Sequence, residues 1–214
     1  MVARESSVWH PSLDLAEDLR IIVLDIVTCA WQTAKTQLNA KSLETPITGR
    51  LVGEMLLEKN RRKIDYFRIE EEVGTRKSED SPKPEGRIDI KIVYDFEEKN
   101  YWGIECKRVS GSKSDGLARK YVDEGVLRFA SGKYSLGHPS AAMIGFVIDG
   151  NAAGAASLIA KAIKASTEVT ASLCKAWAPA PQFGNHEHLY TTEHRQAGAS
   201  EIVILHFFLP LTPK

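Results

Sequence analysis

Two short runs in the middle of the chain alternate apolar and polar residues, as strands with one buried face do. In residues 86–93, three isoleucines occupy one set of alternate positions, and the other set consists of Arg87, Asp89, Lys91 and Val93. In residues 101–107, one face carries Trp102, Ile104 and Cys106, and the other carries Gly103, Glu105 and Lys107. Because strand side chains alternate between faces, each run predicts a strand with charged groups on a single surface.

The segment between these runs has room for one hairpin turn, centred near Glu97 and Glu98. Such a turn would place Asp89 beside Glu105 on one surface of the sheet. Lys107 would lie two residues farther along that surface. The pattern therefore predicts that two carboxylates and an ammonium group converge on one patch.

The rest of the pattern predicts four helices and four further strands around this pair. Apolar spacing of three or four residues predicts helices at residues 12–38, 43–59, 115–134 and 152–177. Short β-branched and aromatic runs predict strands at residues 66–73, 142–148, 187–195 and 201–209, and a polar loop is expected at 75–85. We therefore expect an α/β fold in which helices flank a mixed central sheet. The expected single domain, 1–214, comprises a helical extension (1–40), a core (43–150), and a helix with two C-terminal strands (151–214).

The residue types on the predicted patch are those that a hydrolytic Mg2+ site uses. Mg2+ takes oxygen ligands and is commonly held by one or two carboxylates, several waters and substrate phosphate oxygens. A bound Mg2+ lowers the pKa of a water ligand and stabilises charge that develops on a phosphodiester. A lysine beside it can orient the attacking water, although burial lowers a lysine pKa and adjacent carboxylates raise it. The protonation state of Lys107 is therefore open at this stage.

An aspartate on one strand, followed by acid–any–lysine on the next, resembles the signature of the PD-(D/E)xK, or restriction-endonuclease-like, nuclease superfamily. The matching residues are Asp89 and Glu105-Cys106-Lys107, although Ile88 stands where the name-giving proline would be. The resemblance implies a core of helix, three strands, helix and strand. It also implies that Asp89, Glu105 and the backbone carbonyl of Cys106 bind metal, and that Lys107 positions the attacking water.

The same resemblance implies a Mg2+-dependent nuclease, with Mn2+ as an expected substitute, that hydrolyses phosphodiester bonds of nucleic acid, and we expect DNA rather than RNA as the substrate. A bacterial restriction or antiphage defence system is the expected setting. Two alternatives remain open. Acid–any–lysine on a strand is often a solvated face with a cross-strand ion pair. The scaffold could also be a catalytically inactive module that binds nucleic acid or a partner protein.

Members of this superfamily often place a further acid on the helix that precedes the first strand. Glu44, Glu54 and Glu58 are the acids available there. On a helical wheel, the apolar stripe consists of Leu43, Ile47, Leu51 and Met55. Glu44 falls within that stripe, where a carboxylate needs a partner or a metal, so we assign it to the site and keep Glu54 as the second choice. Alternatively, Glu44 only complements the helix dipole.

The helix after the two strands carries Tyr121 and Arg128, which are candidates for binding substrate. Arg128 could clamp a phosphate, and Tyr121 could hydrogen-bond the same phosphate or Glu105. Arg128 could equally be a surface ion-pair partner. Basic residues cluster at 107–120 and at 59–63, and both clusters could follow a phosphate backbone or simply be solvated.

Three histidines, His186, His188 and His194, suggest a zinc site as a further alternative. On one strand, they would spread over about 26 Å at roughly 3.3 Å per residue, which is too far for one ion. We therefore expect His194 and Arg195 to be structural or substrate-side residues rather than zinc ligands.

Composition restricts the remaining choices. The chain has 214 residues, of which 43% are hydrophobic, and its 28 basic and 28 acidic residues cancel. A zero net charge argues against a protein dedicated to coating DNA, but an acidic site and a basic rim can cancel in a nuclease. Three widely separated cysteines and the absence of a long apolar run predict a cytoplasmic protein without membrane contact. A homodimer or a separate recognition subunit is compatible with the sequence.

Overall fold

The computed structural model describes residues 13–75, 86–95, 100–112, 116–196 and 200–211. Its centre is a seven-stranded mixed sheet in the order β1-β2-β3-β4-β7-β6-β5. The expected α/β class is therefore confirmed. The loop predicted at 75–85 and the turn predicted near Glu97 lie almost entirely outside the described residues.

The strands are β1 (Arg68–Thr75), β2 (Gly86–Val93), β3 (Tyr101–Val109), β4 (Ser140–Val147), β5 (Leu173–Pro179), β6 (Leu189–Arg195) and β7 (Glu201–Pro210). The α-helices are α1 (Leu13–Ala34), α2 (Glu44–Arg61), α3 (Leu117–Tyr121), α4 (Leu127–Ala130), α5 (Ala152–Ala165) and α6 (Thr167–Ser172). Short 3-10 turns are η1 (Lys35–Gln37) and η3 (Pro181–Phe183), and η2 (Val122–Val126) is a π-helical turn. The predicted order from α2 to β4, helix, three strands, helix and strand, is confirmed.

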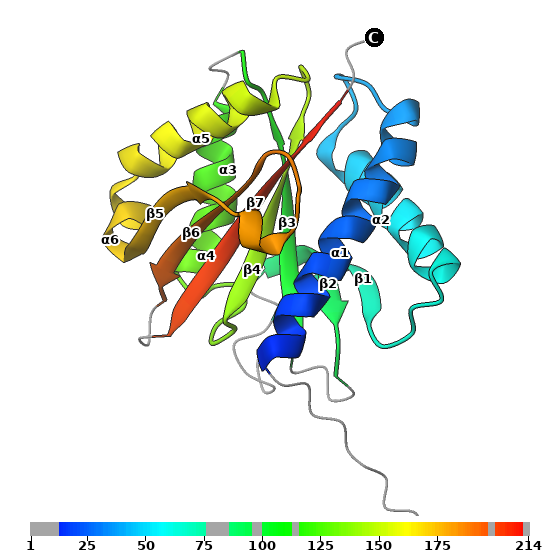
Figure 1. The fold of residues 1–214 in the computed structure, drawn as a ribbon. Helices are drawn as coiled ribbons and strands as arrows, with labels where there is room; N and C mark the ends of the chain where they lie inside the picture. The colour runs from blue at the N-terminus through cyan, green and yellow to red at the C-terminus, as the bar shows by residue number, and fades with distance from the viewer. Residues whose placement is uncertain (1–12, 76–85, 96–99, 113–115, 197–199, 212–214) are drawn as a thin grey trace, which may run out of the picture.

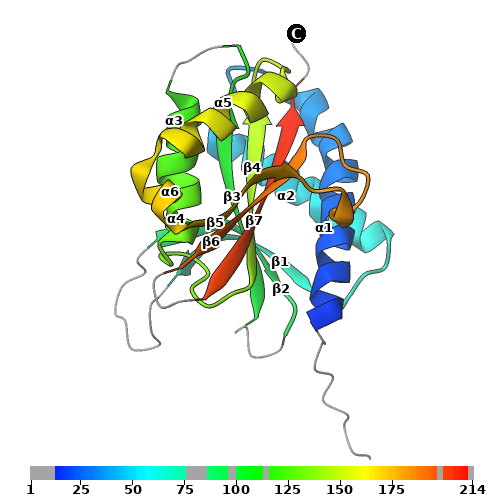
Figure 2. The same ribbon diagram turned by 60° about the vertical axis from the view of Figure 1, so that its left-hand side comes forward.

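Helices cover both faces of the sheet and give three layers. Figures 1 and 2 show α1 and α2 on one face and α3 to α6 on the other. Each face buries its own apolar cluster, and the first includes Trp31, Leu51 and Phe146. The second includes Phe129 and Phe208. Strand β4 lies between parallel neighbours β3 and β7 and is buried along its whole length, as central parallel strands are.

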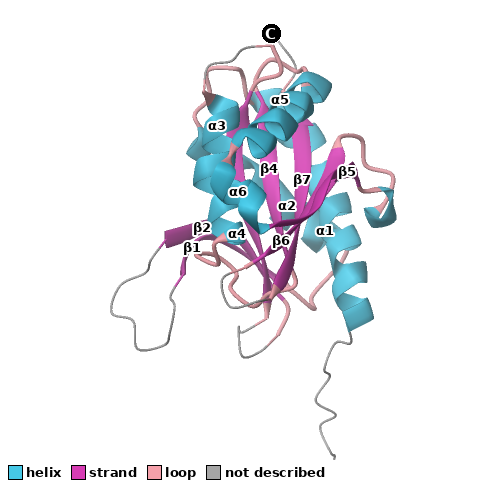
Figure 3. Cartoon of the chain, turned by 90° about the vertical axis from the view of Figure 1, so that its left-hand side faces the viewer, coloured by secondary structure: helices cyan, strands magenta, loops and turns pink. Residues whose placement is uncertain are grey.

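Strand β2 pairs with β3 over only half its length. The antiparallel partners run from Val93 opposite Tyr101 to Ile90 opposite Ile104, and the pairing stops there. Beyond this point β2 follows β1, and Figure 3 shows these two strands leaving the body of the sheet. This divergence corrects the predicted face, because Ile90 belongs to the first cluster, whereas Ile88 belongs to the second.

The C-terminal segment differs from the prediction of one long helix followed by two strands. The helix predicted at 152–177 ends at Ala165, and Ser166 caps the short helix α6 by accepting a hydrogen bond from the Val169 amide. Residues 173–179 then form β5, an edge strand paired with β6. The alanines of this segment favour helix, but pairing with β6 overrides that local preference.

Candidate metal and catalytic site

The point where β2 leaves β3 brings Asp89 to the backbone of β3. Continuing the register of Ile90 and Ile104 by one residue places Asp89 opposite Glu105, as predicted. Oδ2 of Asp89 accepts a hydrogen bond of 2.7 Å from the Cys106 amide. The carboxylate thus satisfies a β3 donor that has lost its strand partner, and this contact fixes the side chain at the edge of β3.

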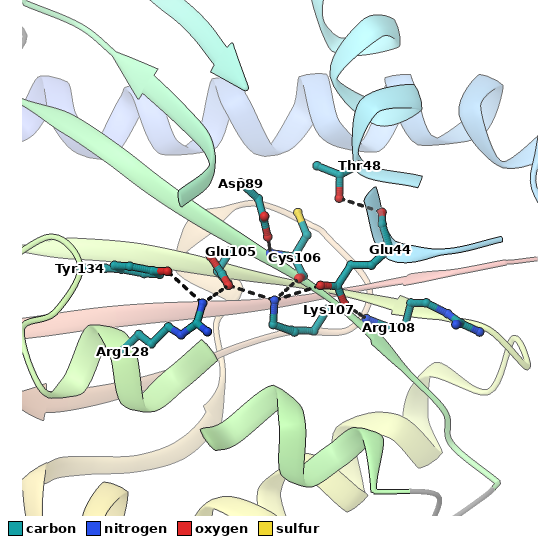
Figure 4. A network of polar contacts seen from close by, with 9 residues as sticks. All are labelled: Glu44, Thr48, Asp89, Glu105, Cys106, Lys107, Arg108, Arg128 and Tyr134. Carbon is teal, nitrogen blue, oxygen red and sulfur yellow. Dashed lines mark hydrogen bonds and ion pairs between the residues drawn. The ribbon is translucent and has the colours of Figure 1, made fainter. Parts of the chain in front are cut away.

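Glu44, at the first residue of α2, satisfies the next donor on the same edge. Its Oε2 accepts a hydrogen bond of 3.0 Å from the Arg108 amide, two residues beyond Cys106. Amides two residues apart point to the same side of a strand. Both carboxylates therefore line one edge of β3, and Figure 4 shows them on either side of Cys106 and Lys107.

Lys107 connects Glu44 with Glu105. Its Nζ lies 3.0 Å from Oε1 of Glu44, 2.9 Å from Oε1 of Glu105 and 2.9 Å from the carbonyl oxygen of Cys106. The residue is 7% exposed, so these three acceptors take the place of water around the ammonium group. The predicted convergence of Asp89, Glu105 and Lys107 is therefore present.

Glu105 is the most deeply buried acid of the site, with 1% exposure. Its Oε1 accepts hydrogen bonds from Lys107 and, at 3.1 Å, from Nη1 of Arg128. Among the described residues, none supplies a hydrogen-bond partner for the other oxygen, Oε2. A buried carboxylate oxygen without a donor is costly, and such an atom is a natural place for a cation or water.

Arg128 is brought to the site, where its guanidinium is hydrogen-bonded to side chains of the protein. Besides Glu105, its Nη1 donates a hydrogen bond of 2.8 Å to the hydroxyl of Tyr134. Tyr134 was not among the predicted residues, because a helix over 115–134 would place it on a different face from Arg128, whereas α4 ends at Ala130. The Tyr134 ring packs closely on Gly86, where a side chain would collide with it. These contacts orient Arg128 toward Glu105.

Burial and charge shift the pKa values of Glu105, Asp89 and Lys107. Burial, and then the Asp89 charge, raise the pKa of Glu105 to about 7, and burial also raises the pKa of Asp89. For Lys107, burial lowers the pKa, but Glu105, Glu44 and Asp89 together raise it more. The net effect holds its pKa above the usual lysine value, so Lys107 is an ammonium group in this arrangement.

The structure separates Glu44 from the two other helix acids. Glu54 pairs with Arg50 at 2.7 Å, and Glu58 pairs with Arg61 and Arg62. Glu44 therefore supplies the helix carboxylate of the site, as predicted. The predicted apolar stripe is buried except at Leu43, which is 65% exposed because it precedes the helix and has an extended backbone.

Tyr121 is not brought to the site, and its predicted substrate contact is wrong for this conformation. The side chain is fully buried, and its hydroxyl lies 3.1 Å from Nδ1 of His206. The π-helical turn η2 begins at the next residue and places Gly125 over the sheet. A side chain at Gly125 would collide with Met143, and the Lys107 stem lies within contact distance. This glycine therefore allows the helix to cover Lys107 closely.

Tyr121 instead begins a buried chain of hydrogen bonds that the sequence did not reveal. Thr192 Oγ1 lies 2.9 Å from Nε2 of both His206 and His194, and Nδ1 of His194 lies 3.0 Å from Ser172 Oγ. Ser172 donates its own proton to the Val169 carbonyl at 2.8 Å, so it accepts from Nδ1 of His194. Because burial lowers the pKa of both histidines, both rings are neutral, and the chain then places the proton of His194 on Nδ1 and that of His206 on Nε2.

We expect both buried histidines to resist protonation. Burial lowers the pKa of His194 to about 4 and the pKa of His206 well below its usual value. Because the pKa of His194 is lower in the folded protein than in the unfolded chain, the fold favours the neutral ring. Its contribution to the free energy of unfolding is therefore fully present above about pH 6.5. It is lost as the pH falls toward 4, by about 3 kcal/mol in all. A histidine NMR titration should show a His194 midpoint near pH 4, whereas a midpoint of 6 or above would contradict the hydrogen-bond chain.

The zinc alternative finds no support. His186 lies against α1, with Nδ1 3.1 Å from Thr28 Oγ1, and His188 also precedes β6, whereas His194 is buried within β6. Among the residues that the structure describes, no three His, Cys, Asp or Glu side chains form a group that could hold a metal.

The predicted basic clusters are mostly engaged with nearby protein groups. In the cluster at residues 59–63, Lys59 donates to the Ile64 carbonyl, and Arg61 and Arg62 bind Glu58. In the cluster at residues 107–120, Arg119 pairs with Asp123, and Arg108 donates to the Ala40 carbonyl. Lys113 lies outside the described residues. Arg108 reaches the acids only through its backbone amide, which binds Glu44, whereas Lys107 and Arg128 reach them through their charged groups.

The donor atoms present fit a hard divalent cation. Two carboxylates, Asp89 and Glu105, and the Cys106 carbonyl lie at one edge of β3, and Oε2 of Glu105 is buried without a donor among the described residues. Mg2+ needs only one or two protein carboxylates, because waters and substrate oxygens complete its shell. Glu44 lies against Lys107 instead of joining the other acids in a three-carboxylate group.

Comparisons of the chain with protein-family models, with curated proteins and with solved structures found no match. The helices of the described chain include none with the length and apolar character needed to cross a bilayer.

Proposed function

We propose that this protein is a Mg2+-dependent nuclease with a restriction-endonuclease-like core, and that DNA is its substrate. The observation that carries the proposal is the joint placement of Asp89, Glu105 and Lys107 where β2 leaves β3, with Glu44 from α2 closing the same edge. An ordinary solvated ion pair would be exposed. Here, Glu105 and Lys107 are almost wholly buried. The bacterial restriction or antiphage setting belongs to the same proposal.

Asp89, Glu105 and the Cys106 carbonyl would hold the Mg2+ ion. The ion would act as a Lewis acid and would lower the pKa of a bound water. Asp89 is held in place by the Cys106 amide, so its position does not depend on the ion. Arg128 and Tyr134 orient Glu105 from the opposite side. Lys107, as an ammonium group, donates hydrogen bonds and adds positive charge where a phosphodiester gains negative charge.

Arg108 flanks the site on the other face of β3, because it follows Lys107 on the strand, and its backbone amide binds Glu44. Its guanidinium donates a hydrogen bond of 2.9 Å to the Ala40 carbonyl and, in Figure 4, points away from Glu44. A guanidinium held by a backbone carbonyl is oriented before substrate arrives, which favours a phosphate contact. Arg108, rather than Tyr121, is therefore the residue proposed to contact a phosphate at the flank of the site.

The test is a cleavage assay on supercoiled plasmid, linear duplex, single-stranded DNA and RNA, with Mg2+ or with EDTA. We expect DNA to be cleaved with Mg2+ and to remain intact with EDTA. Folded protein that cleaves none of these substrates would contradict the proposal.

The alternative is a non-catalytic module that binds nucleic acid or a partner protein. One observation favours it: Lys107 already neutralises Glu44 and Glu105 without any metal. Calorimetry distinguishes the two functions, because a nuclease should take up Mg2+ or Mn2+ in a manner that depends on Asp89. A module of this kind should take up neither ion.

A further inference from the structure

Lys107 contacts two of the three groups that the proposed function assigns to the metal site, the Glu105 carboxylate and the Cys106 carbonyl. Its Nζ is bound by Oε1 of Glu105 and by the Cys106 carbonyl, each at 2.9 Å. Glu44 supplies the third acceptor, at 3.0 Å. An ammonium group has three donors, and all three are satisfied by these contacts.

The surroundings hold the ammonium group in this position. The Lys107 side chain is almost wholly buried, and its methylene stem lies beneath Gly125 of the π-helical turn η2. Three carboxyl groups, Glu44, Asp89 and Glu105, face two cations, Lys107 and Arg128. Removal of Lys107 from this set would leave buried negative charge with only one partner.

We infer that Lys107 is a built-in counterion that occupies the cation position of the metal-free protein and competes with a divalent ion for Glu105 and the Cys106 carbonyl. This inference rests on the proposed function, since it concerns the same site. Divalent ions then bind only as the ammonium group gives up contacts with these oxygens. The lysine thereby keeps the acids assembled without metal and weakens metal binding.

The test measures Mn2+ binding by electron paramagnetic resonance, in which free Mn2+ is counted directly, and it needs no substrate. Lys107→Met should bind Mn2+ at least about tenfold more tightly than the parent, because a competing positive charge is removed. Lys107→Arg, which keeps the charge, should not gain this affinity. Lys164→Met, an equal charge change at an exposed position on α5, is the matched control and should bind as the parent does.

Equal or weaker Mn2+ binding by folded Lys107→Met would overturn the inference, as would the absence of binding in both proteins. If the parent cleaves DNA while Lys107→Met binds no more tightly, the inference fails and the nuclease stands. If only Lys107→Met binds Mn2+, the inference holds and the metal-dependent nuclease fails.

A measurement on the unaltered protein decides the matter if Lys107→Met does not fold. In 15N-lysine-labelled protein, a buried and hydrogen-bonded ammonium group gives an NMR signal protected from exchange with water. We expect the Lys107 signal, assigned by its loss in Lys107→Arg, to shift or disappear on saturation with Mg2+. A Lys107 signal that Mg2+ leaves unchanged would overturn the inference.

Discussion

Asp89→Asn and Glu105→Gln should each reduce Mg2+-dependent DNA cleavage roughly 10³-fold, an effect of the size seen when one electrostatic group of an active site is removed. Each amide keeps the shape of the side chain but removes the negative charge that would hold the ion. In Asp89→Asn, the new side-chain carbonyl can still accept from the Cys106 amide. In Glu105→Gln, it can still accept from Lys107 and Arg128. Single-turnover cleavage of plasmid DNA measures the effect.

Glu193→Gln is the matched control for these two variants. Glu193 lies on β6 and pairs with Lys175 at 2.8 Å, outside the contacts of the site. Its substitution removes the same charge and should leave cleavage unchanged. If the folded Asp89→Asn and Glu105→Gln proteins cleave as fast as Glu193→Gln, Asp89 and Glu105 do not form the metal site.

Thr192→Val should lower the free energy of unfolding by about 2–5 kcal/mol, because two buried hydrogen bonds lose their common partner. The Thr192 hydroxyl accepts from Nε2 of His206 and donates to Nε2 of His194, both at 2.9 Å. Valine fills the same volume without the hydroxyl, so it leaves a buried donor and a buried acceptor unsatisfied. Urea unfolding at pH 7.5 measures the loss.

Thr192→Ser separates the hydrogen bonds from packing. Serine retains the hydroxyl and loses only a methyl group, so about 1 kcal/mol or less of destabilisation is expected. A valine variant as stable as the serine variant would show that the chain from Tyr121 to Ser172 contributes little to stability.

The local pattern predicted most of the elements because their signals are short-range. Alternation in residues 86–93 and 101–107 predicted β2 and β3, and the position of Asp89 relative to Glu105 followed from one turn between them. The helix wheel predicted Glu44 because a carboxylate within an apolar stripe needs a partner. Lys107 and the Arg108 amide are those partners.

What the sequence did not predict depends on contacts between distant segments. The edge strand β5 forms in an alanine-containing segment because β6 pairs with it. Tyr121 and Arg128 lie on the same helical segment, but the π-helical turn between them changes the helical spacing. Arg128 therefore meets Glu105, whereas Tyr121 meets His206 on β7.

The protonation state of Lys107 also required the structure. Burial lowers the pKa of a lysine and neighbouring carboxylates raise it, so the sequence alone does not give the direction of the shift. The distances from Nζ to the acceptor oxygens decide it. With three acceptors at 2.9–3.0 Å, the carboxylates dominate and raise the lysine pKa. Lys107 therefore acts in this state as a hydrogen-bond donor and positive charge rather than as a base.

The most direct measurement of the central claim is an anomalous difference map from a crystal soaked in Mn2+. We expect one strong peak within coordination distance of the Asp89 and Glu105 carboxylates and the Cys106 carbonyl, with the Lys107 ammonium moved from its metal-free contacts. A fully soaked crystal whose peaks all lie elsewhere, with Lys107 still bound to Glu105, would contradict it.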